Sequence, residues 1–279
     1  PKTVQIFLPD GNARSVRIAE VTSRTVQAIQ IPRKALKAAS ARDEVQRVGV
    51  YFLFGETNDP AGTPVAYIGE AENCYTRLQQ HHRRKDFWET AVAITSKTMS
   101  FTKAHARYLE YDCLRKARDA DRFRLKNTAI PAEPHIPEPM QAELRDNFGT
   151  VRTLLSMLGV PILDPLTTAA DTQEHLLHCS GRGATATGAY TEDGLVVFAG
   201  STVAQTIVPS VRDTLPPRRQ RLMDEGVLHE NESGQWVFAK DHPFNSPSGA
   251  ASIVLGRSAN GWREWTDRHG RTLDALERQ

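Results

Sequence analysis

Apolar and polar positions alternate near the start of the chain in the manner of β-strands. The alternating runs are 4–8, 15–21 and 25–31. Aspartate and glycine within 9–12 supply turn chemistry between the first two runs. Pro32 suits the first turn of a helix, because its missing N–H would have no partner there, so a short helix is predicted over 33–41. These elements predict a small β-rich appendage over residues 1–47.

Two apolar, aromatic-rich runs follow, with a polar segment between them. The runs are VGVYFLFG at 48–55 and PVAYIGEA at 64–71, and the segment between them contains Asp59-Pro60 and Gly62. This arrangement is typical of a β-hairpin with a longer loop. If the pairing is symmetric about Asp59, Tyr51 lies across from Tyr67, about 5 Å away at Cβ.

After the hairpin, the spacing of apolar residues becomes that of helices. We predict a helix over 73–84, a strand over 89–96 and a long helix over 103–120 with Thr102 as its N-cap. The apolar stripe of the long helix consists of Ala106, Leu109, Cys113 and Ala117. Glu110 lies inside this stripe, where a carboxylate is unusual.

Four prolines between residues 128 and 141 predict a semi-rigid linker, followed by a helix over 142–158. From residue 181 onward, strands and helices alternate again. The predicted elements there are strands at 189–190, 195–199 and 235–239 and helices at 216–224 and 249–255. The predicted organisation is an appendage at 1–47, a compact α/β domain at 48–127, a Pro-rich linker and helix at 128–180, and a separate C-terminal α+β domain at 181–279.

The net charge of +2 conceals a strong division along the chain. Residues 1–127 carry 22 lysines and arginines and 14 acidic residues, a net charge of +8, and the remainder carries 13 and 19, a net charge of −6. A basic half attracts phosphate backbones electrostatically. A solvated surface rich in lysine and arginine is the alternative interpretation.

Composition excludes several other classes of protein. With 39% hydrophobic and 24% charged residues, the chain is typical of a globular protein long enough for two domains. No secretion signal or apolar span of eighteen residues is found, and the three cysteines are far apart and odd in number. We therefore expect a cytoplasmic protein without a membrane partner, a disulfide framework or a zinc site; its oligomeric state stays open.

Glu110 is the first candidate for chemistry. A carboxylate on a buried stripe costs several kcal/mol unless a cation or a hydrogen-bond donor meets it. An ion pair with an arginine and a role as a metal ligand both remain possible. Arg77 and His81 are four residues apart on the preceding helix and so share one face. Arginine is suited to phosphate, although a surface salt bridge for Arg77 and a packed histidine for His81 are the simpler alternatives.

Several short motifs occur in a recognisable order within residues 48–127. They are Gly49-Val50-Tyr51, Tyr67-Ile68-Gly69, Arg77, His81, Tyr108-Leu109-Glu110 and Arg124-Leu125-Lys126-Asn127. Together they resemble the GIY-YIG nuclease superfamily, with Val50 in place of the more usual isoleucine. The resemblance implies a compact α/β fold with a three-stranded antiparallel sheet flanked by helices.

A second resemblance concerns the C-terminal region. The segments SPSGAA at 246–251 and NGWREW at 260–265, with Gly256 between them, are similar to bacterial proteins in which a GIY-YIG domain precedes domain of unknown function 4357. This resemblance indicates which domains occur together and not what the C-terminal domain does.

The nuclease resemblance implies an endonuclease that hydrolyses phosphodiester bonds in nucleic acid, with DNA as the expected substrate. It implies one divalent cation, Mg²⁺ or Mn²⁺, held by Glu110 together with water and phosphate oxygens, as suits hard cations. Arg77 would neutralise the charge that grows on the phosphoryl oxygens.

The proton acceptor is left open by the sequence. A phenol with a pKa near 10 is ionised only to about one part in a thousand at pH 7, so Tyr51 needs assistance as a base. We expect Tyr51 to act as the base or to position water, Tyr67 to hydrogen-bond phosphate or water, and His81 to assist. Asn127 is expected to orient the Tyr67 side of the site or a backbone segment; a helix-ending turn residue is the alternative.

Further residues are predicted to contact the substrate. Gly69 is placed among the substrate-binding residues, although close approach of the backbone to a neighbouring group is the favoured role for this glycine. The basic residues that could follow a bound strand are Arg83, Arg84, Lys85, Lys97 and Lys103. Many of these cations could equally be solvated surface charges.

Two rival hypotheses accompany the nuclease prediction. In the first, the domain is a catalytically inactive nucleic-acid-binding or regulatory module that uses the nuclease fold. In the second, the C-terminal domain carries the recognition function, with a local basic surface at Arg218, Arg219 and Arg221.

Overall fold

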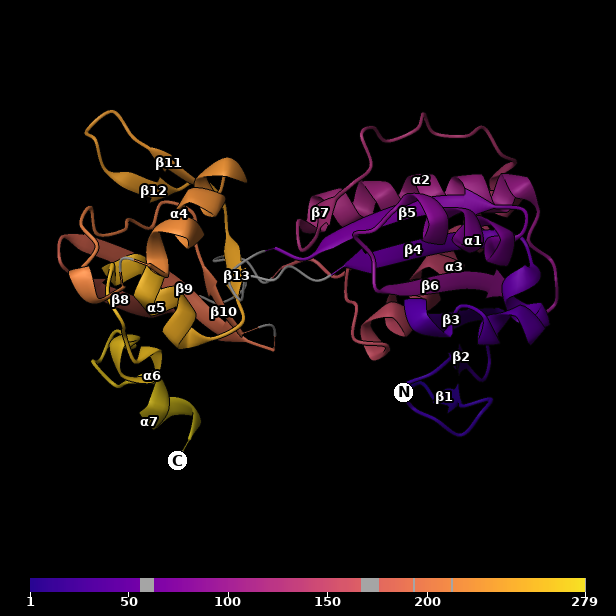
Figure 1. The fold of residues 1–279 in the computed structure, drawn as a ribbon, viewed down its shortest axis with the longest axis horizontal. Helices are drawn as coiled ribbons and strands as arrows, with labels where there is room; N and C mark the ends of the chain where they lie inside the picture. Colours follow the sequence, from indigo (N-terminus) through magenta and orange to yellow (C-terminus); the bar gives the residue numbers. More distant parts are fainter. Residues whose placement is uncertain (56–62, 167–175, 193, 212, 279) are drawn as a thin grey trace. The chain divides into compact units, whose positions relative to one another are not determined.

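The apolar runs of the N-terminal half form one β-sheet in the computed structural model, which describes residues 1–55, 63–166, 176–192, 194–211 and 213–278 (Figure 1). The chain divides into two compact units, the first ending at Pro165 and the second beginning at Leu166. Both units contain helices and strands, which confirms the mixed α+β class predicted from the sequence.

The sheet of the first unit has seven strands among the described residues, in the order β1-β2-β3-β6-β4-β5-β7. The strands are β1 (Val4–Phe7), β2 (Arg17–Val21), β3 (Val26–Pro32), β4 (Gly49–Gly55), β5 (Val65–Ala71), β6 (Thr90–Ser96) and β7 (Arg124–Leu125). Neighbours are antiparallel, except that β7 runs parallel to β5. The sheet is therefore wider than the three strands expected from the nuclease resemblance.

The N-terminal strands belong to this sheet and do not form a separate appendage. β3 pairs with β6 along its whole length, from Val26 opposite Ser96 to Pro32 opposite Thr90. The backbone donors and acceptors on that side of β6 are satisfied by β3. The helix expected over 33–41 is also absent from the described residues, where 3₁₀ turns form at Arg33–Ala35, Ala38–Ala41 and Asp43–Gln46.

Alternation along the strands gives the sheet two apolar faces. The flanking helices are α1 (Cys74–Arg84), α2 (Lys103–Ala120) and α3 (Glu138–Met157). Phe52 and Ile68 lie in the core cluster shared with α2 and α3. Tyr51 and Leu53 lie in the cluster shared with α1. The sheet is thus covered on both faces (Figure 1).

Helix starts follow from side-chain caps. The Asn73 side chain accepts a hydrogen bond from the backbone N–H of Thr76 at 2.9 Å, so α1 begins where the sequence predicts. At the start of α2, the Thr102 hydroxyl is 2.7 Å from Nδ1 of His105. These caps set where the helices that carry Arg77 and Glu110 begin.

The hairpin is present, but its register differs from the symmetric pairing. Tyr51 pairs with Gly69, and Tyr67 pairs with Leu53. The predicted loop at 56–63 falls, apart from Thr63, outside the described residues. Loop length alone does not determine the register of a long-looped hairpin.

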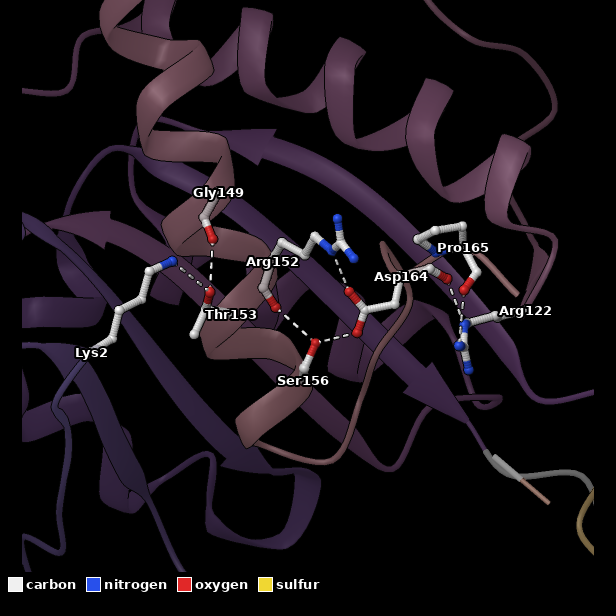
Figure 2. Close-up of polar contacts among 8 residues, drawn as sticks. All are labelled: Lys2, Arg122, Gly149, Arg152, Thr153, Ser156, Asp164 and Pro165. Carbon is white, nitrogen blue, oxygen red and sulfur yellow. Dashed lines mark hydrogen bonds and ion pairs between the residues drawn. The ribbon is translucent and has the colours of Figure 1, made fainter. Parts of the chain in front are cut away.

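The segment after the prolines packs on the sheet, although residues 128–180 were expected to form a linker and helix. Leu144, Val151 and Leu154 of α3 are buried in the core of the first unit. Beyond α3, the Asp164 carboxylate accepts hydrogen bonds from Arg152 Nε and Ser156 Oγ (Figure 2). These contacts hold the end of the first unit against α3.

Replacing Asp164 by alanine is expected to lower the free energy of unfolding of the first unit by about 1–3 kcal/mol, since two hydrogen bonds to a charged acceptor are lost. Urea denaturation would measure this change. Asp146→Ala is the matched control, because the Asp146 ion pair with Arg24 is solvent-exposed and contributes about 0–1 kcal/mol. Equal effects of the two substitutions would contradict the tethering role of Asp164.

The second unit is built on a four-stranded antiparallel sheet in the order β13-β10-β9-β8. Its strands are β8 (Leu177–Gly181), β9 (Ala184–Thr191), β10 (Gly194–Val197), β11 (Leu228–Glu230), β12 (Trp236–Phe238) and β13 (His242–Phe244); its helices are α4 (Leu215–Asp224), α5 (Pro247–Leu255), α6 (Gly261–Glu264) and α7 (Leu273–Glu277). β11 and β12 form a separate hairpin. Trp265 is fully buried and donates its indole N–H to the carbonyl of Pro247, which joins the two motifs of the C-terminal resemblance.

None of the helices in the described part of the chain is both long enough and apolar enough to cross a lipid bilayer.

Candidate active site

The Tyr51 hydroxyl is the centre of a polar cluster on the α1 face of the sheet. Tyr51 lies on β4 and is 1% exposed. Its oxygen is 2.8 Å from Nε2 of His81 and accepts a hydrogen bond from Nε of Arg77 at 3.4 Å. Because Arg77 and His81 are one helical turn apart, α1 brings both against the same hydroxyl.

Tyr67 adds a third ring to this cluster from β5. Its ring centroid is 6.2 Å from that of Tyr51 and 5.4 Å from that of His81. The ammonium of Lys85 lies 4.0 Å from the centroid of the Tyr67 ring, in a cation–π arrangement. Tyr67 is half-buried, so it can reach a ligand at the surface as well as the cluster beneath.

Gly69 makes room for the hydroxyl of Tyr51. A Cβ atom at position 69 would lie 2.2 Å from the hydroxyl oxygen and 2.5 Å from the ring carbon that carries it. The structure therefore gives Gly69 a packing role toward Tyr51. The contact with substrate predicted for this residue remains a prediction.

Burial holds Tyr51 and His81 in their uncharged forms. Burial, with a further contribution from Tyr67, raises the pKa of the Tyr51 phenol far above its ordinary value. Burial, followed by the positive charges of Arg77, Lys85 and Arg84, lowers the pKa of His81 to about 4. At neutral pH the free protein therefore holds a neutral phenol against a neutral imidazole.

An NMR titration of the His81 imidazole is expected to show a midpoint near pH 4, well below the value of about 6.5 for an unperturbed histidine. The unfolded chain takes up this proton more readily than the folded chain. His81 therefore reduces stability progressively as the pH falls from about 6.5 toward 4. A midpoint at 6.5 or above would contradict the burial of a neutral imidazole.

Glu110 lies on α2, which covers the other face of the sheet, and is half-buried. Burial and then the negative charge of Glu70 raise the pKa of the Glu110 carboxyl. A backbone hydrogen bond at Glu70 and the charges of Arg107 and Arg77 act in the opposite direction. The effect of Arg77 on Glu110 is the smallest of these, whereas Arg77 donates a hydrogen bond directly to the Tyr51 hydroxyl.

The carboxylate oxygens of Glu110 are of the type that a hard divalent cation prefers as ligands. Glu70 repels the ionised form of Glu110, and Arg107 relieves part of that repulsion, since its Nε lies 4.0 Å from a carboxylate oxygen of Glu70. Within the described part of the chain, no group of three or more His, Cys, Asp or Glu side chains could hold a metal. A cation held by Glu110 would have to take most of its ligands from water and substrate.

Asn127 follows β7, and its side chain bonds the backbone of β5. Its Oδ1 accepts from the backbone N–H of Ile68 at 3.0 Å, and its Nδ2 donates to the carbonyl of Ile68 at 2.8 Å. The side chain thereby extends the pairing of β5 beyond β7. Asn127 positions the strand that carries Tyr67 and Gly69. Of the roles expected for Asn127, these bonds correspond to the orientation of a backbone segment.

The other basic residues differ in their availability. Arg83 and Arg84 are exposed on α1. Lys103 is ion-paired with Glu72 at 2.7 Å, and Lys97 with Glu20 at 3.2 Å. These two lysines would have to leave a carboxylate partner to follow a bound strand.

Two charged residues near the site were not predicted. Glu70 influences Glu110, and Lys126 lies close enough to Lys85 to lower the pKa of the Lys85 ammonium, after the larger effect of burial. Both are next to motif residues in the sequence: Glu70 follows Gly69 and Lys126 precedes Asn127. Their position next to motif residues was the available signal in the sequence. That position alone does not indicate which of the residues beside a motif lies near the site.

The prediction of a basic surface at Arg218, Arg219 and Arg221 is wrong for Arg219. This side chain is 4% exposed and donates to the carbonyls of Ala204 and Ile253, both at 2.6 Å. Burial lowers its pKa to about 10. Arg219 ties α4 to the end of α5 and cannot contribute to a surface that contacts nucleic acid.

Comparison with known proteins identifies the C-terminal region alone. Residues 177–277 match the family described as a domain of unknown function (DUF4357), which confirms the resemblance found in the motifs at 246–265. The chain has no match among curated proteins or solved structures. The nuclease resemblance of residues 48–127 stays a prediction, and the domain match assigns no activity.

Proposed function

We propose that residues 48–127 carry a GIY-YIG endonuclease site that hydrolyses phosphodiester bonds in nucleic acid, with DNA as the substrate and Mg²⁺ or Mn²⁺ as the cofactor. The observation that carries the proposal is the Tyr51 hydroxyl held between His81 and Arg77. The order β6-β4-β5, with α1 and α2 on opposite faces, supports the three-stranded arrangement that the resemblance implies.

The site presents positive charge to an incoming phosphate. Arg77, Arg84 and Lys85 lie close enough to His81 to depress its pKa, and Lys126 lies close to Lys85. Clustered cations attract a phosphate backbone and release counterions on binding. Arg77 is the cation best placed to follow charge onto the phosphoryl oxygens, because it bonds the Tyr51 hydroxyl on which the proposed site is centred.

Proton transfer is assigned from the two pKa values. A phenol whose pKa is raised by burial is a poor base, so Tyr51 positions the attacking water through its hydroxyl oxygen. His81 is neutral and can accept a proton. Binding of a phosphate anion beside it raises its pKa and makes it a stronger acceptor. Glu110 would hold the cation, which supplies charge stabilisation to the phosphate and the leaving oxygen.

The test is a cleavage assay with the full chain. Labelled single- and double-stranded DNA and RNA are incubated with Mg²⁺, with Mn²⁺ or with EDTA. We expect a product that requires the metal and is formed fastest from DNA. If no substrate yields a metal-dependent product while the protein binds the same nucleic acids, the inactive binding module would replace the nuclease.

A further inference from the structure

The far flank of α2 forms a pocket that the proposed active site does not use. It has a volume of about 460 Å³, within the usual range for small-molecule sites. Tyr108 and Tyr111 of α2 and Phe148 of α3 line it. Tyr111 and Phe148 are half-buried, and the rings of Tyr108 and Tyr111 are 6.2 Å apart. The pocket thus offers aromatic surface to a planar group.

Three cations surround these rings. Arg115 and Lys116 come from α2, and Arg145 comes from α3. Arg115 is paired with Asp112 at 2.8 Å. Among the residues that the structure describes, Lys116 and Arg145 have no carboxylate partner. Two cations beside an aromatic surface remain available to an anion.

The second carboxylate at the pocket is already engaged. Glu133 accepts a hydrogen bond from the Tyr111 hydroxyl at 3.3 Å and from Gln141 Nε2 at 3.5 Å. These bonds hold the Tyr111 ring beside the pocket. The three cations of the pocket, Arg115, Lys116 and Arg145, outnumber its two carboxylates, Asp112 and Glu133.

The pocket is separate from the candidate active site. Residues two apart point to nearly opposite sides of an α-helix, so Tyr108 and Asp112 leave α2 on the side away from Glu110. The pocket also contacts α3, whereas Arg77 and His81 lie on α1. A ligand bound here would leave Glu110 accessible.

We propose that this pocket binds a nucleotide unit, with the base against Tyr111 and Phe148 and the phosphate between Lys116 and Arg145. Aromatic rings suit a base, and cations suit a phosphate. A nucleotide carries both groups, so it matches the two features of the pocket together. The nucleotide can be free in solution or part of a nucleic-acid strand. The proposal goes beyond phosphodiester cleavage and does not depend on it.

The test measures binding to the full chain in EDTA, so that no cleavage takes place. The probes are dAMP, a ten-nucleotide oligo(dA) and inorganic phosphate, measured by isothermal titration calorimetry. The Lys116→Ala/Arg145→Ala double variant is expected to raise the Kd about tenfold or more, and Tyr111→Leu about tenfold. Arg118→Ala, which removes an exposed cation of α2 outside the pocket, is expected to change it less than about twofold.

Each probe gives a decisive outcome. Pocket-dependent binding of dAMP supports a free nucleotide, and pocket-dependent binding of the oligonucleotide alone supports a strand. Inorganic phosphate binding as tightly as dAMP, without dependence on Tyr111, would overturn the proposal. So would binding of all three probes that is unchanged in the double variant, provided that thermal melts show the variant to be folded.

Discussion

Replacing Glu110 by glutamine is expected to lower the rate of metal-dependent phosphodiester cleavage by about 10³-fold or more, since a catalytic cation contributes several kcal/mol of transition-state stabilisation. Glutamine keeps the shape of the side chain but removes the charge that would hold the cation. The measurement is the single-turnover cleavage rate at saturating protein. Glu72→Gln is the matched control, because Glu72 is an exposed carboxylate ion-paired with Lys103 and should change the rate less than about twofold.

The same variant has a second readout that does not require activity. Because the folded pKa of Glu110 is raised, ionising it reduces stability at pH values above that pKa. Glutamine resembles the protonated form. The Tm of the variant should therefore exceed that of the wild type at pH 7. The difference should shrink as the pH falls through the raised pKa of Glu110 and should vanish below about 4.5. A rate that is unchanged, with this Tm behaviour present, would show that Glu110 is buried near Glu70 without serving in catalysis.

Alanine at position 69 is expected to destabilise the first unit by about 1–3 kcal/mol and to lower cleavage by about 10²-fold. The new methyl group would overlap the hydroxyl and ring of Tyr51. Relief requires the phenol to move away from His81 and Arg77, which removes the alignment on which the proposed chemistry depends. Urea denaturation measures the first effect and the cleavage rate measures the second.

Two controls make the assignment to Tyr51 specific. Gly149 lies in α3 with nothing within 4 Å of an added Cβ, so Gly149→Ala should be neutral or stabilise the protein by up to about 1 kcal/mol. In a Tyr51→Ala background the overlapping atoms are gone, so Gly69→Ala should lose most of its destabilising effect. An equal loss of stability in both backgrounds would place the strain elsewhere.

Local structure in the first unit was largely predictable from the sequence. The helix after Asn73, the helix after Thr102 and the strand now bounded as Thr90–Ser96 were found from apolar period and caps, because these signals act within a few residues. Pairing between distant segments was not predictable in this way. The N-terminal strands have the alternation of any half-buried strand, and nothing in that pattern indicates that β3 pairs with β6.

In the candidate site too, local features were predictable from the sequence and contacts between distant segments were not. Helical spacing was enough to place Arg77 and His81 on one face, but the hairpin register was needed to show that Tyr51 faces Gly69 and not Tyr67. The motifs did not reveal Glu70, because its influence on Glu110 depends on how α2 crosses β5. The raised pKa of Tyr51 and the lowered pKa of His81 arise from burial, which is a property of the folded chain.

The pairing of β3 with β6 determines how the part of the sheet that carries the motifs can be isolated. A fragment starting at residue 48 would retain the motifs but expose the full edge of β6, whose backbone groups would then be free to pair with another molecule. Such a fragment is prone to self-association, and its behaviour in solution would say little about the full chain. The smallest unit suitable for biochemical work is therefore set by the width of the sheet, and it includes segments that carry no residue of the candidate site.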